Sequence, residues 1–172
     1  NCHQTTFGMS ERLLGAVVGM HGDDSGLILP PSVSPYQIIL MPVAAHVNEQ
    51  VIPKINDLAK ELRGSGFRVH VDDRDIRPGG KHYHWEIRGA PIRLELGPRD
   101  LDANKCVLSL RTGGKIEVSL ENLSQTINQY LDDISETLLN RSLNNNSELV
   151  QKFPGISSKD SGWELNSPIV DG

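Results

Sequence analysis

The sequence VDDRDIRPGGKHYHWEIRGAPIRLELGPRD, residues 71–100, decides the fold because it joins two expected strands. The apolar run that ends at Val71 predicts the first strand, and the alternation of apolar and charged residues over 92–96 predicts the second, with its charges on one face. Between them, Pro78 and two glycines break the chain, and residues 81–88 are expected to form a short helix that a glycine and a proline end.

Rings, cations and one carboxylate are concentrated in this expected helix. One interpretation is a solvated crossover with Trp85 turned into the core. The other is a surface for single-stranded RNA, because rings stack on bases, cations hold phosphates, and a carboxylate with arginines can hydrogen-bond base edges. Composition alone leaves both interpretations open.

A resemblance to a known family favours the second interpretation. The motifs DDRD at 72–75, PGGK at 78–81 and WEIRGAPIRLELGPRD at 85–100 resemble the anticodon-binding domain of archaeal and eukaryotic-type prolyl-tRNA synthetases. A second stretch, SERLLGAVVGMHGDDSGLILPP at 10–31, resembles the end of that family's catalytic domain, including the third class II motif. Both stretches lie in the family's order and at its spacing.

Patterns elsewhere in the chain predict an α/β layer with a mixed sheet of about five strands and three helices, which agrees with the anticodon-domain fold that the resemblance implies. Apolar runs and alternation predict strands over 36–43, 67–71, 92–96, 106–110 and 115–120. Amphipathic spacing predicts helices over 47–63, 81–88 and 121–141. Asn144 and the residues after it are expected to break the last helix. The first strand, helix and strand form a right-handed βαβ unit, and functional sites in such sheets gather beyond the strand carboxyl ends.

The domain organisation follows from the two resemblances and from a proline-rich stretch. Residues 1–30 are expected to be the end of an antiparallel class II catalytic domain, with a strand ending at Phe7 and a helix capped by Ser10. Residues 31–35 are expected to be a linker, 36–141 the anticodon-binding domain, and 142–172 a tail or the start of a C-terminal module. The chain begins with Asn1 instead of methionine, so we expect a fragment of a longer protein.

Composition limits the kind of partner. A net charge of −5 over 172 residues argues against bulk attraction to nucleic acid and favours a discriminating surface in which acids dilute the cations. Only two cysteines, Cys2 and Cys106, are present, which fits a reduced cytoplasmic protein without disulfides or a CxxC zinc site. No run approaches the ~20 apolar residues of a membrane span.

The resemblance also implies which residues read the anticodon. Proline codons begin with CC, so the anticodons of proline tRNAs share two guanines; a carboxylate suits the N1 and N2 hydrogens of guanine, and an arginine fork suits its N7 and O6. The family's reading positions correspond to Glu86, Arg93 and Arg99. His82 takes the place of a base-stacking phenylalanine, and Lys81 is expected to contact phosphate. The alternative for Glu86 and Arg93 is an ordinary surface salt bridge, worth only ~0–1 kcal/mol.

For the first thirty residues, the resemblance implies contacts to ATP. Gln4, Thr6 and Ser10 match positions that contact ATP or organise its metal and the prolyl adenylate, and Arg12 matches an arginine that packs on adenine. An arginine in a first helical turn is otherwise usually just exposed. Asp23 and Asp24 are more simply loop acids than a metal site, because they supply too few ligands. The pair His82 and His84 diverges by about 200° on a helix, so shared metal ligation is not expected.

The sequence therefore predicts the C-terminal part of a prolyl-tRNA synthetase, an ATP- and Mg²⁺-dependent ligase that attaches proline to tRNA(Pro). The parent enzyme is expected to be a cytoplasmic homodimer with no membrane association. We expect no catalytic residue in this piece and no aminoacylation by it alone, because it lacks the first two class II motifs. The alternative is a freestanding RNA-binding or regulatory module that kept the fold without catalysis.

Overall fold

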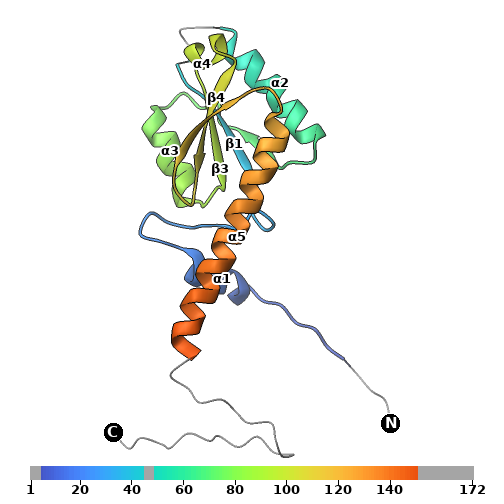
Figure 1. Cartoon of the computed structure of the whole chain (residues 1–172), viewed down its shortest axis with the longest axis vertical. Coiled ribbons are helices and arrows are strands. Elements are labelled where there is room, and N and C mark those ends of the chain that lie inside the picture. The colour runs from blue at the N-terminus through green and yellow to red at the C-terminus, as the bar shows by residue number, and fades with distance from the viewer. Residues whose placement is uncertain (1–4, 45–48, 151–172) are drawn as a thin grey trace, which may run out of the picture.

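The computed structural model describes residues 5–44 and 49–150 and forms an α/β layer with one helix before it (Figure 1). In chain order the elements are α1 (Arg12–His21), β1 (Ile38–Pro42), α2 (Val51–Gly64), β2 (Val69–Val71), α3 (Pro78–Ile87), β3 (Ile92–Leu96), α4 (Pro98–Asp102), β4 (Lys105–Leu110), β5 (Lys115–Ser119) and α5 (Leu123–Val150). Among these helices none combines the length and apolarity of a membrane span.

The sheet is mixed and has the strand order β2-β1-β3-β4-β5. Strand β1 pairs in parallel with both β2 and β3, whereas β3, β4 and β5 pair in antiparallel fashion. The predicted five-stranded mixed sheet is therefore confirmed, as is the parallel unit β1-α2-β2. The hairpin of β4 and β5 turns through two glycines, as its sequence predicts.

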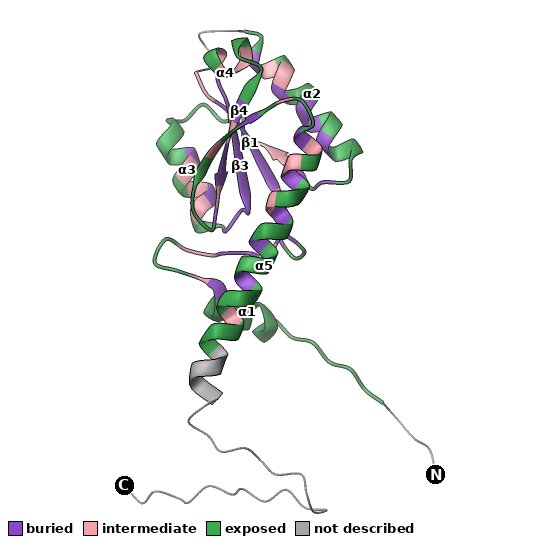
Figure 2. Ribbon diagram, in the orientation of Figure 1, coloured by how far each residue is buried: buried purple, intermediate pink, exposed green. Residues whose placement is uncertain are grey.

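The two faces of the sheet differ in chemistry. On one face, alternate residues of the strands pack against α2 and α5 in a continuous apolar core, whose fully buried members include Ile38, Leu40, Ile92, Leu94 and Leu108. Figure 2 shows this burial along the central strands. Burial of these side chains stabilises the fold by about 1.5–3 kcal/mol each.

Helix α3 covers the other face, where the sheet changes from apolar to polar. On β1, Ile39 and Met41 form a small cluster with Trp85 of α3. In the strand register, Ile39 lies beside Arg93 and Met41 beside Glu95, so the next strand presents two charges toward the same side. The charges expected on one face of β3 are thus confirmed, and they lie partly under α3.

Two expectations about helices are wrong. Residues Pro98–Asp102 form an additional short helix, because Pro98 suits a first helical position and the Asp100 carboxylate accepts the Gly97 amide at 2.9 Å. Helix α5 does not break at Asn144 but continues to Val150. Each asparagine disfavours a helix by less than about 1 kcal/mol, and no glycine or proline interrupts this stretch.

The residues before the sheet also depart from expectation. Helix α1 begins at Arg12, follows Glu11, and has no side-chain cap, so Ser10 does not cap it. Residues 5–7 form no strand, because no described neighbour supplies the hydrogen-bonding partners that a strand requires. The expected linker is held in place: the Arg68 guanidinium donates to the carbonyls of Pro31 at 2.6 Å and Ser34 at 2.9 Å.

Candidate nucleic-acid interface

The first aspartate of DDRD joins α3 to the sheet. The side chain of Asp72, which follows β2, is fully buried and accepts hydrogen bonds from Trp85 Nε1 at 2.7 Å and from Arg74 Nη2 at 2.7 Å. Its backbone carbonyl accepts the Lys81 ammonium at 2.9 Å. Burial alone would raise the pKa of Asp72, but the hydrogen bonds from Arg74 and Trp85 outweigh it and hold the pKa well below its ordinary value. The carboxylate therefore stays charged and holds the second half of α3 through Trp85, while the Asp72 carbonyl holds its first half through Lys81.

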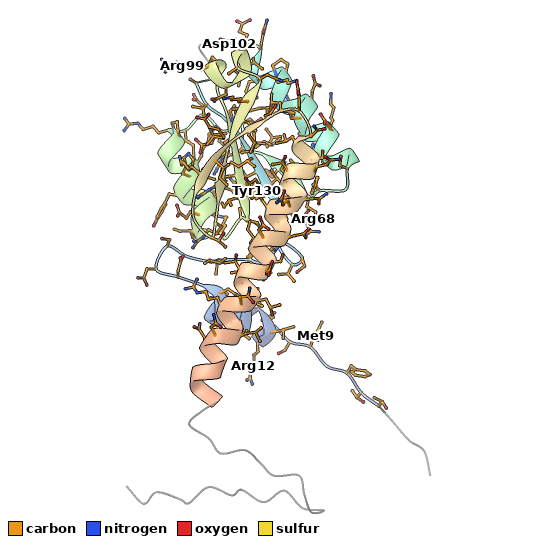
Figure 3. All side chains as sticks on the ribbon, viewed as in Figure 1. Met9, Arg12, Arg68, Arg99, Asp102 and Tyr130 are labelled. Atoms are coloured by element: carbon orange, nitrogen blue, oxygen red, sulfur yellow. The ribbon has the colours of Figure 1, made fainter. Side chains whose placement is uncertain are left out.

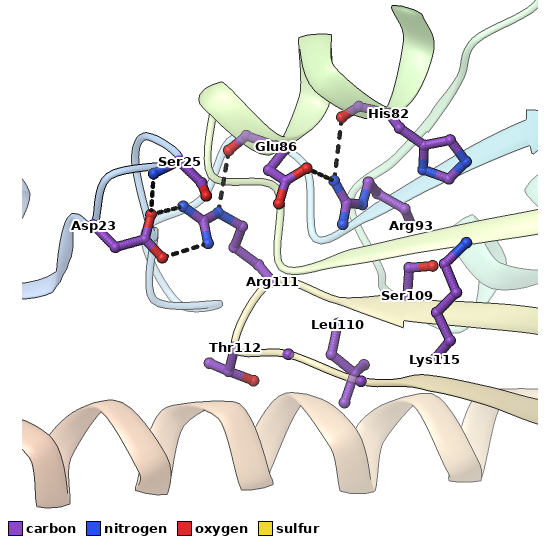
Figure 4. Close-up of a pocket in the computed structure, with 12 residues that line it drawn as sticks. Asp23, Ser25, His82, Glu86, Arg93, Ser109, Leu110, Arg111, Thr112 and Lys115 are labelled. Atoms are coloured by element: carbon purple, nitrogen blue, oxygen red, sulfur yellow. Dashed lines mark hydrogen bonds and ion pairs between the residues drawn. The ribbon is translucent and has the colours of Figure 1, made fainter. Parts of the chain in front are cut away.

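In its last turn, α3 places a carboxylate over a buried arginine. Arg93 of β3 lies with Nη1 3.4 Å from Oε2 of Glu86 and donates to the carbonyl of His82 at 3.1 Å (Figure 4). The Arg93 side chain is only 8% exposed, whereas that of Glu86 is 36% exposed. Among the described residues, buried Nε of Arg93 has no hydrogen-bond partner. The pair thus presents an oriented carboxylate to solvent above an unsatisfied donor.

Glu95 continues this polar surface along the sheet. Its carboxylate lies 3.3 Å from Nε2 of His82, accepts the Ser109 hydroxyl at 3.0 Å, and lies 3.4 Å from the Lys115 ammonium. Three elements, α3, β4 and β5, therefore meet at one carboxylate. The His82 ring is held at this position with its side chain 23% exposed.

The side chains of His82, Glu86, Arg93, Ser109 and Lys115 line a pocket of about 590 Å³ together with the turn that joins β4 and β5. The volume falls in the range of pockets that hold small molecules or single nucleotides. Its lining includes acceptors, at Glu86, and donors, at Arg93 and Lys115. Such a mixture suits hydrogen bonding to base edges better than simple attraction to phosphate.

Residues 37–130 match the sequence profile of a protein family described as the anticodon binding domain. The chain belongs to the anticodon binding domain family. The matched residues include every strand of the sheet and helix α3, so they contain the side chains from α3, β3, β4 and β5 that line the pocket.

The chain is also similar to archaeal enzymes named proline--tRNA ligase. It is 49% identical over 171 residues to the one from Thermococcus kodakarensis, covering 98% of this chain and 36% of the relative. Identity is 44% over 141 residues with that of Methanothermobacter thermautotrophicus, covering 81% and 29%, and 38% over 168 residues with that of Methanocorpusculum labreanum, covering 97% and 35%. The chain thus spans about a third of the length of the curated relatives it matches.

The anticodon binding domain brings together three of the five residues expected to contact the anticodon: His82, Glu86 and Arg93 line one pocket. Arg99 does not line it. That residue is exposed on α4, beyond the carboxyl end of β3, at the end of the molecule opposite Arg12 (Figure 3).

The position of Lys81 does not support the expected phosphate contact. The residue is buried, and its ammonium holds the loop that follows β2 instead of facing an open surface. It borders a second pocket, of about 410 Å³, at the carboxyl ends of β1 and β2, where Arg74 and Arg77 are also found. The Glu86 pocket lies elsewhere, on the α3 face of the sheet, because Arg93 is the second residue of β3 and pairs with Ile39, the second residue of β1. The strand carboxyl ends are therefore not where the expected base-reading pair meets.

None of the described residues expected to contact ATP lines this pocket. Gln4 falls outside the described residues. Thr6, Ser10 and Arg12 are exposed at or before the start of α1, and the last two border a separate shallow pocket. Within residues 5–44 and 49–150, no cluster of three or more histidines, cysteines or acids could hold a metal ion.

Sequence reasoning missed several residues of the pocket. Ser109 and Lys115 line it because of the antiparallel register, which pairs Arg93 with Ser109 and Ser109 with Lys115. The alternation within each strand gives the two possible faces, but the pairing between strands decides which residues meet. Arg111 and Asp23 also line the pocket, although they are far apart in the chain.

Proposed function

We propose that this chain is the anticodon-reading part of a proline--tRNA ligase and that the pocket of Glu86 and Arg93 recognises a guanine of the proline anticodon. One observation carries the proposal: the partly exposed carboxylate of Glu86 is oriented by the buried guanidinium of Arg93, whose Nε has no partner among the described residues. The family match and the named relatives support the choice of ligand.

The chemistry favours guanine over other bases. On its Watson–Crick edge, guanine presents two adjacent N–H donors, at N1 and N2, and a carboxylate can accept both in parallel. Adenine and cytosine offer an amino group beside an acceptor nitrogen, and uracil offers one N–H between two carbonyls. Each of these bases would place an acceptor atom next to the Glu86 carboxylate, which is itself only an acceptor. Discrimination of ~1–3 kcal/mol for such a contact corresponds to roughly 5- to 150-fold in affinity.

Glu86 and Arg93 differ in burial, and this difference gives them different roles in the proposal. Arg93 is too deeply buried to act as an open fork, so in this proposal it holds the Glu86 carboxylate in place. Loss of Arg93 would leave the Glu86 side chain mobile. A side chain that is already held in its bound conformation loses less entropy on binding, so its hydrogen bonds contribute more to selective affinity. In this proposal His82 stacks on a neighbouring base, and its Nε2 lies 3.3 Å from the Glu95 carboxylate.

For the parent protein, we propose ATP-dependent attachment of proline to tRNA(Pro) by a cytoplasmic homodimer, with Mg²⁺ neutralising the phosphates of bound ATP. Residues 1–30 would then be the end of the catalytic domain, with Gln4, Thr6, Ser10 and Arg12 at ATP or the adenylate. Exposed apolar side chains of α1 fit this role, because they require cover from a larger domain; they include Leu13, Leu14 and Met20. This piece alone is expected to give no aminoacylation.

The test is equilibrium binding of the chain to a proline tRNA transcript and to transcripts with each anticodon guanine changed, at one fixed salt concentration. The wild type should bind at least one changed transcript about tenfold more weakly, and Glu86→Gln should remove that difference. Glu117→Gln is the matched control, since Glu117 is an exposed acid of β5 paired only with Lys105 among the described residues. Equal binding of all transcripts by the wild type, falling only with salt, would contradict the proposal.

A further inference from the structure

The segment that precedes the family-matched residues is bound to the end of α3. The amide of Leu27 donates to the carbonyl of Ile87 at 2.9 Å, and the amide of Leu29 donates to the carbonyl of Gly89 at 3.3 Å. Carbonyls in the last turn of a helix have no partner within the helix. Residues 27–29 therefore supply hydrogen bonds that α3 cannot make for itself, directly after Glu86.

A buried arginine from the opposite side completes this contact. The Arg111 side chain, at the end of β4, is 3% exposed, and its Nε donates to the carbonyls of both Leu27 at 2.9 Å and Glu86 at 3.1 Å. Its Nη1 donates to Oδ2 of Asp23 at 2.9 Å, and Nη2 pairs with the other carboxylate oxygen (Figure 4). One guanidinium thus joins Asp23, Leu27 and the backbone of Glu86.

Two glycines permit the close approach. A Cβ on Gly26, which has φ +128°, would lie 2.6 Å from the Cα of Ile87. A Cβ on Gly89, with φ +71°, would lie 2.7 Å from the carbonyl oxygen of Leu27. Both contacts are with backbone atoms, which cannot move aside without shifting the segment or the helix. The segment of residues 26–29 and the end of α3 can pack this closely only because both positions are glycine.

We propose that Arg111 and residues 23–29 form a clamp that positions Glu86, so that anticodon selectivity depends on a segment outside the anticodon binding domain itself. This inference rests on the proposed role of Glu86. Arg111 does not touch the Glu86 carboxylate; it holds the backbone from which that side chain extends. Arg111 and Asp23 are therefore positioning residues, and Arg93 remains the group that orients the carboxylate.

The clamp also lies next to α1. The amide of Gly22, which follows α1, donates to the carbonyl of Val18 at 2.8 Å, and Asp23 follows directly. Because linkage is reciprocal, a guanine that binds better to the clamped form must also favour the clamped form of residues 23–29. Binding at the pocket thereby stabilises the chain segment that leads back to α1 and Arg12.

The test uses Asp23→Asn, which keeps the shape of the side chain but removes the charge that Arg111 binds. Asp24→Asn is the matched control, because Asp24 is the adjacent exposed acid and loses the same formal charge. We expect Asp23→Asn to bind proline tRNA about three- to tenfold more weakly, with binding to the guanine-changed transcript unchanged. A purely structural role would weaken binding to both transcripts alike. Asp24→Asn should behave as the wild type.

Combination with Glu86→Gln separates the two proposals. Suppose that Glu86→Gln abolishes discrimination and that adding Asp23→Asn to this variant does not change the ratio of its affinities for the two transcripts. The clamp then acts through Glu86, as inferred. Discrimination that is lost in Glu86→Gln but intact in Asp23→Asn overturns the clamp and leaves the proposed function standing. Discrimination unaffected by Glu86→Gln removes both. Gly26→Ala gives a second, independent perturbation of the same contact and should reproduce the loss of selectivity seen with Asp23→Asn.

Discussion

The indole Nε1 of Trp85 donates to Oδ2 of Asp72 over 2.7 Å and so joins the first residue of WEIRG to the first residue of DDRD. Both groups are buried. The bond gives the buried indole N–H a partner. It also offsets part of the free-energy cost of burying the Asp72 carboxylate. Helix α3, which carries Glu86, is thereby fixed relative to the sheet, which carries Arg93.

Trp85→Phe should destabilise the chain without unfolding it. The substitution keeps a ring against Ile39 and Met41 but removes a hydrogen bond to a charged group, so we expect a loss of about 1.5–3 kcal/mol in the free energy of unfolding. Urea titration would show a lower midpoint with an unchanged slope. Tyr83→Phe is the control on the same helix, because Tyr83 is 66% exposed, and it should change stability by less than about 0.5 kcal/mol. An unchanged midpoint for Trp85→Phe would contradict the structural role of this bond.

The pair of Asp23 and Arg111 should make stability depend on pH in the acid range. The hydrogen bond from Arg111, opposed only in part by desolvation, lowers the pKa of Asp23 from 3.8 to about 2. Because the folded-state pKa is below the unfolded one, the carboxylate contributes stability that is fully present above pH 3.8 and is lost as the pH falls through about 2. The wild type should exceed Asp23→Asn in stability by a constant amount above about pH 5, and the two should converge toward pH 2. Thermal unfolding at a series of pH values measures this difference, and a gap that persists at pH 2 would exclude the ion pair as its source.

Much of the fold follows from local patterns in the sequence. The five strands lie where apolar runs and alternation predict them, since β3 has the predicted bounds and the others differ only at their ends. The ion pair of Glu86 with Arg93, one of the two interpretations drawn from the residues, is present and forms part of the wall of a pocket, whereas base recognition there stays a prediction. Trp85 is likewise both a core residue and the anchor of the helix that carries Glu86.

The rest depends on contacts between distant residues. Asp23 and Arg111 are 88 residues apart, and each alone looks like an ordinary charge near a turn. Lys81 looked like a surface cation, but its long apolar stem is buried and only its ammonium requires a partner, which the Asp72 carbonyl supplies. Such roles are set by strand register and by the packing of helices on the sheet, neither of which appears in a local pattern.

Cys106 should be chemically inert in the folded chain. Burial raises the pKa of its thiol to about 12, with the nearby negative charge of Asp100 as a smaller cause. At pH 8 roughly one thiol in ten thousand would be ionised, and the thiolate is the reactive form. Iodoacetamide should therefore leave Cys106 unmodified in native buffer and modify it fully in urea, as measured by mass spectrometry of the peptide that contains it. Rapid native labelling would mean that β4 opens more readily than its burial implies.

Gly89→Ala should be much more damaging than Gly113→Ala, although both glycines have positive φ angles. An alanine in this region of backbone space is disfavoured by roughly 1–2 kcal/mol at either position. At Gly113 a Cβ meets nothing within 4 Å, so this conformational term is the whole effect. At Gly89 the Cβ would also press on the backbone of Leu27, which must move away and give up its hydrogen bonds with Ile87 and Arg111. We expect Gly89→Ala to lose at least about 2 kcal/mol more than Gly113→Ala in urea unfolding, and to lose anticodon discrimination in tRNA binding. Equal losses for the two variants would show that residues 27–29 are not held against α3 in solution.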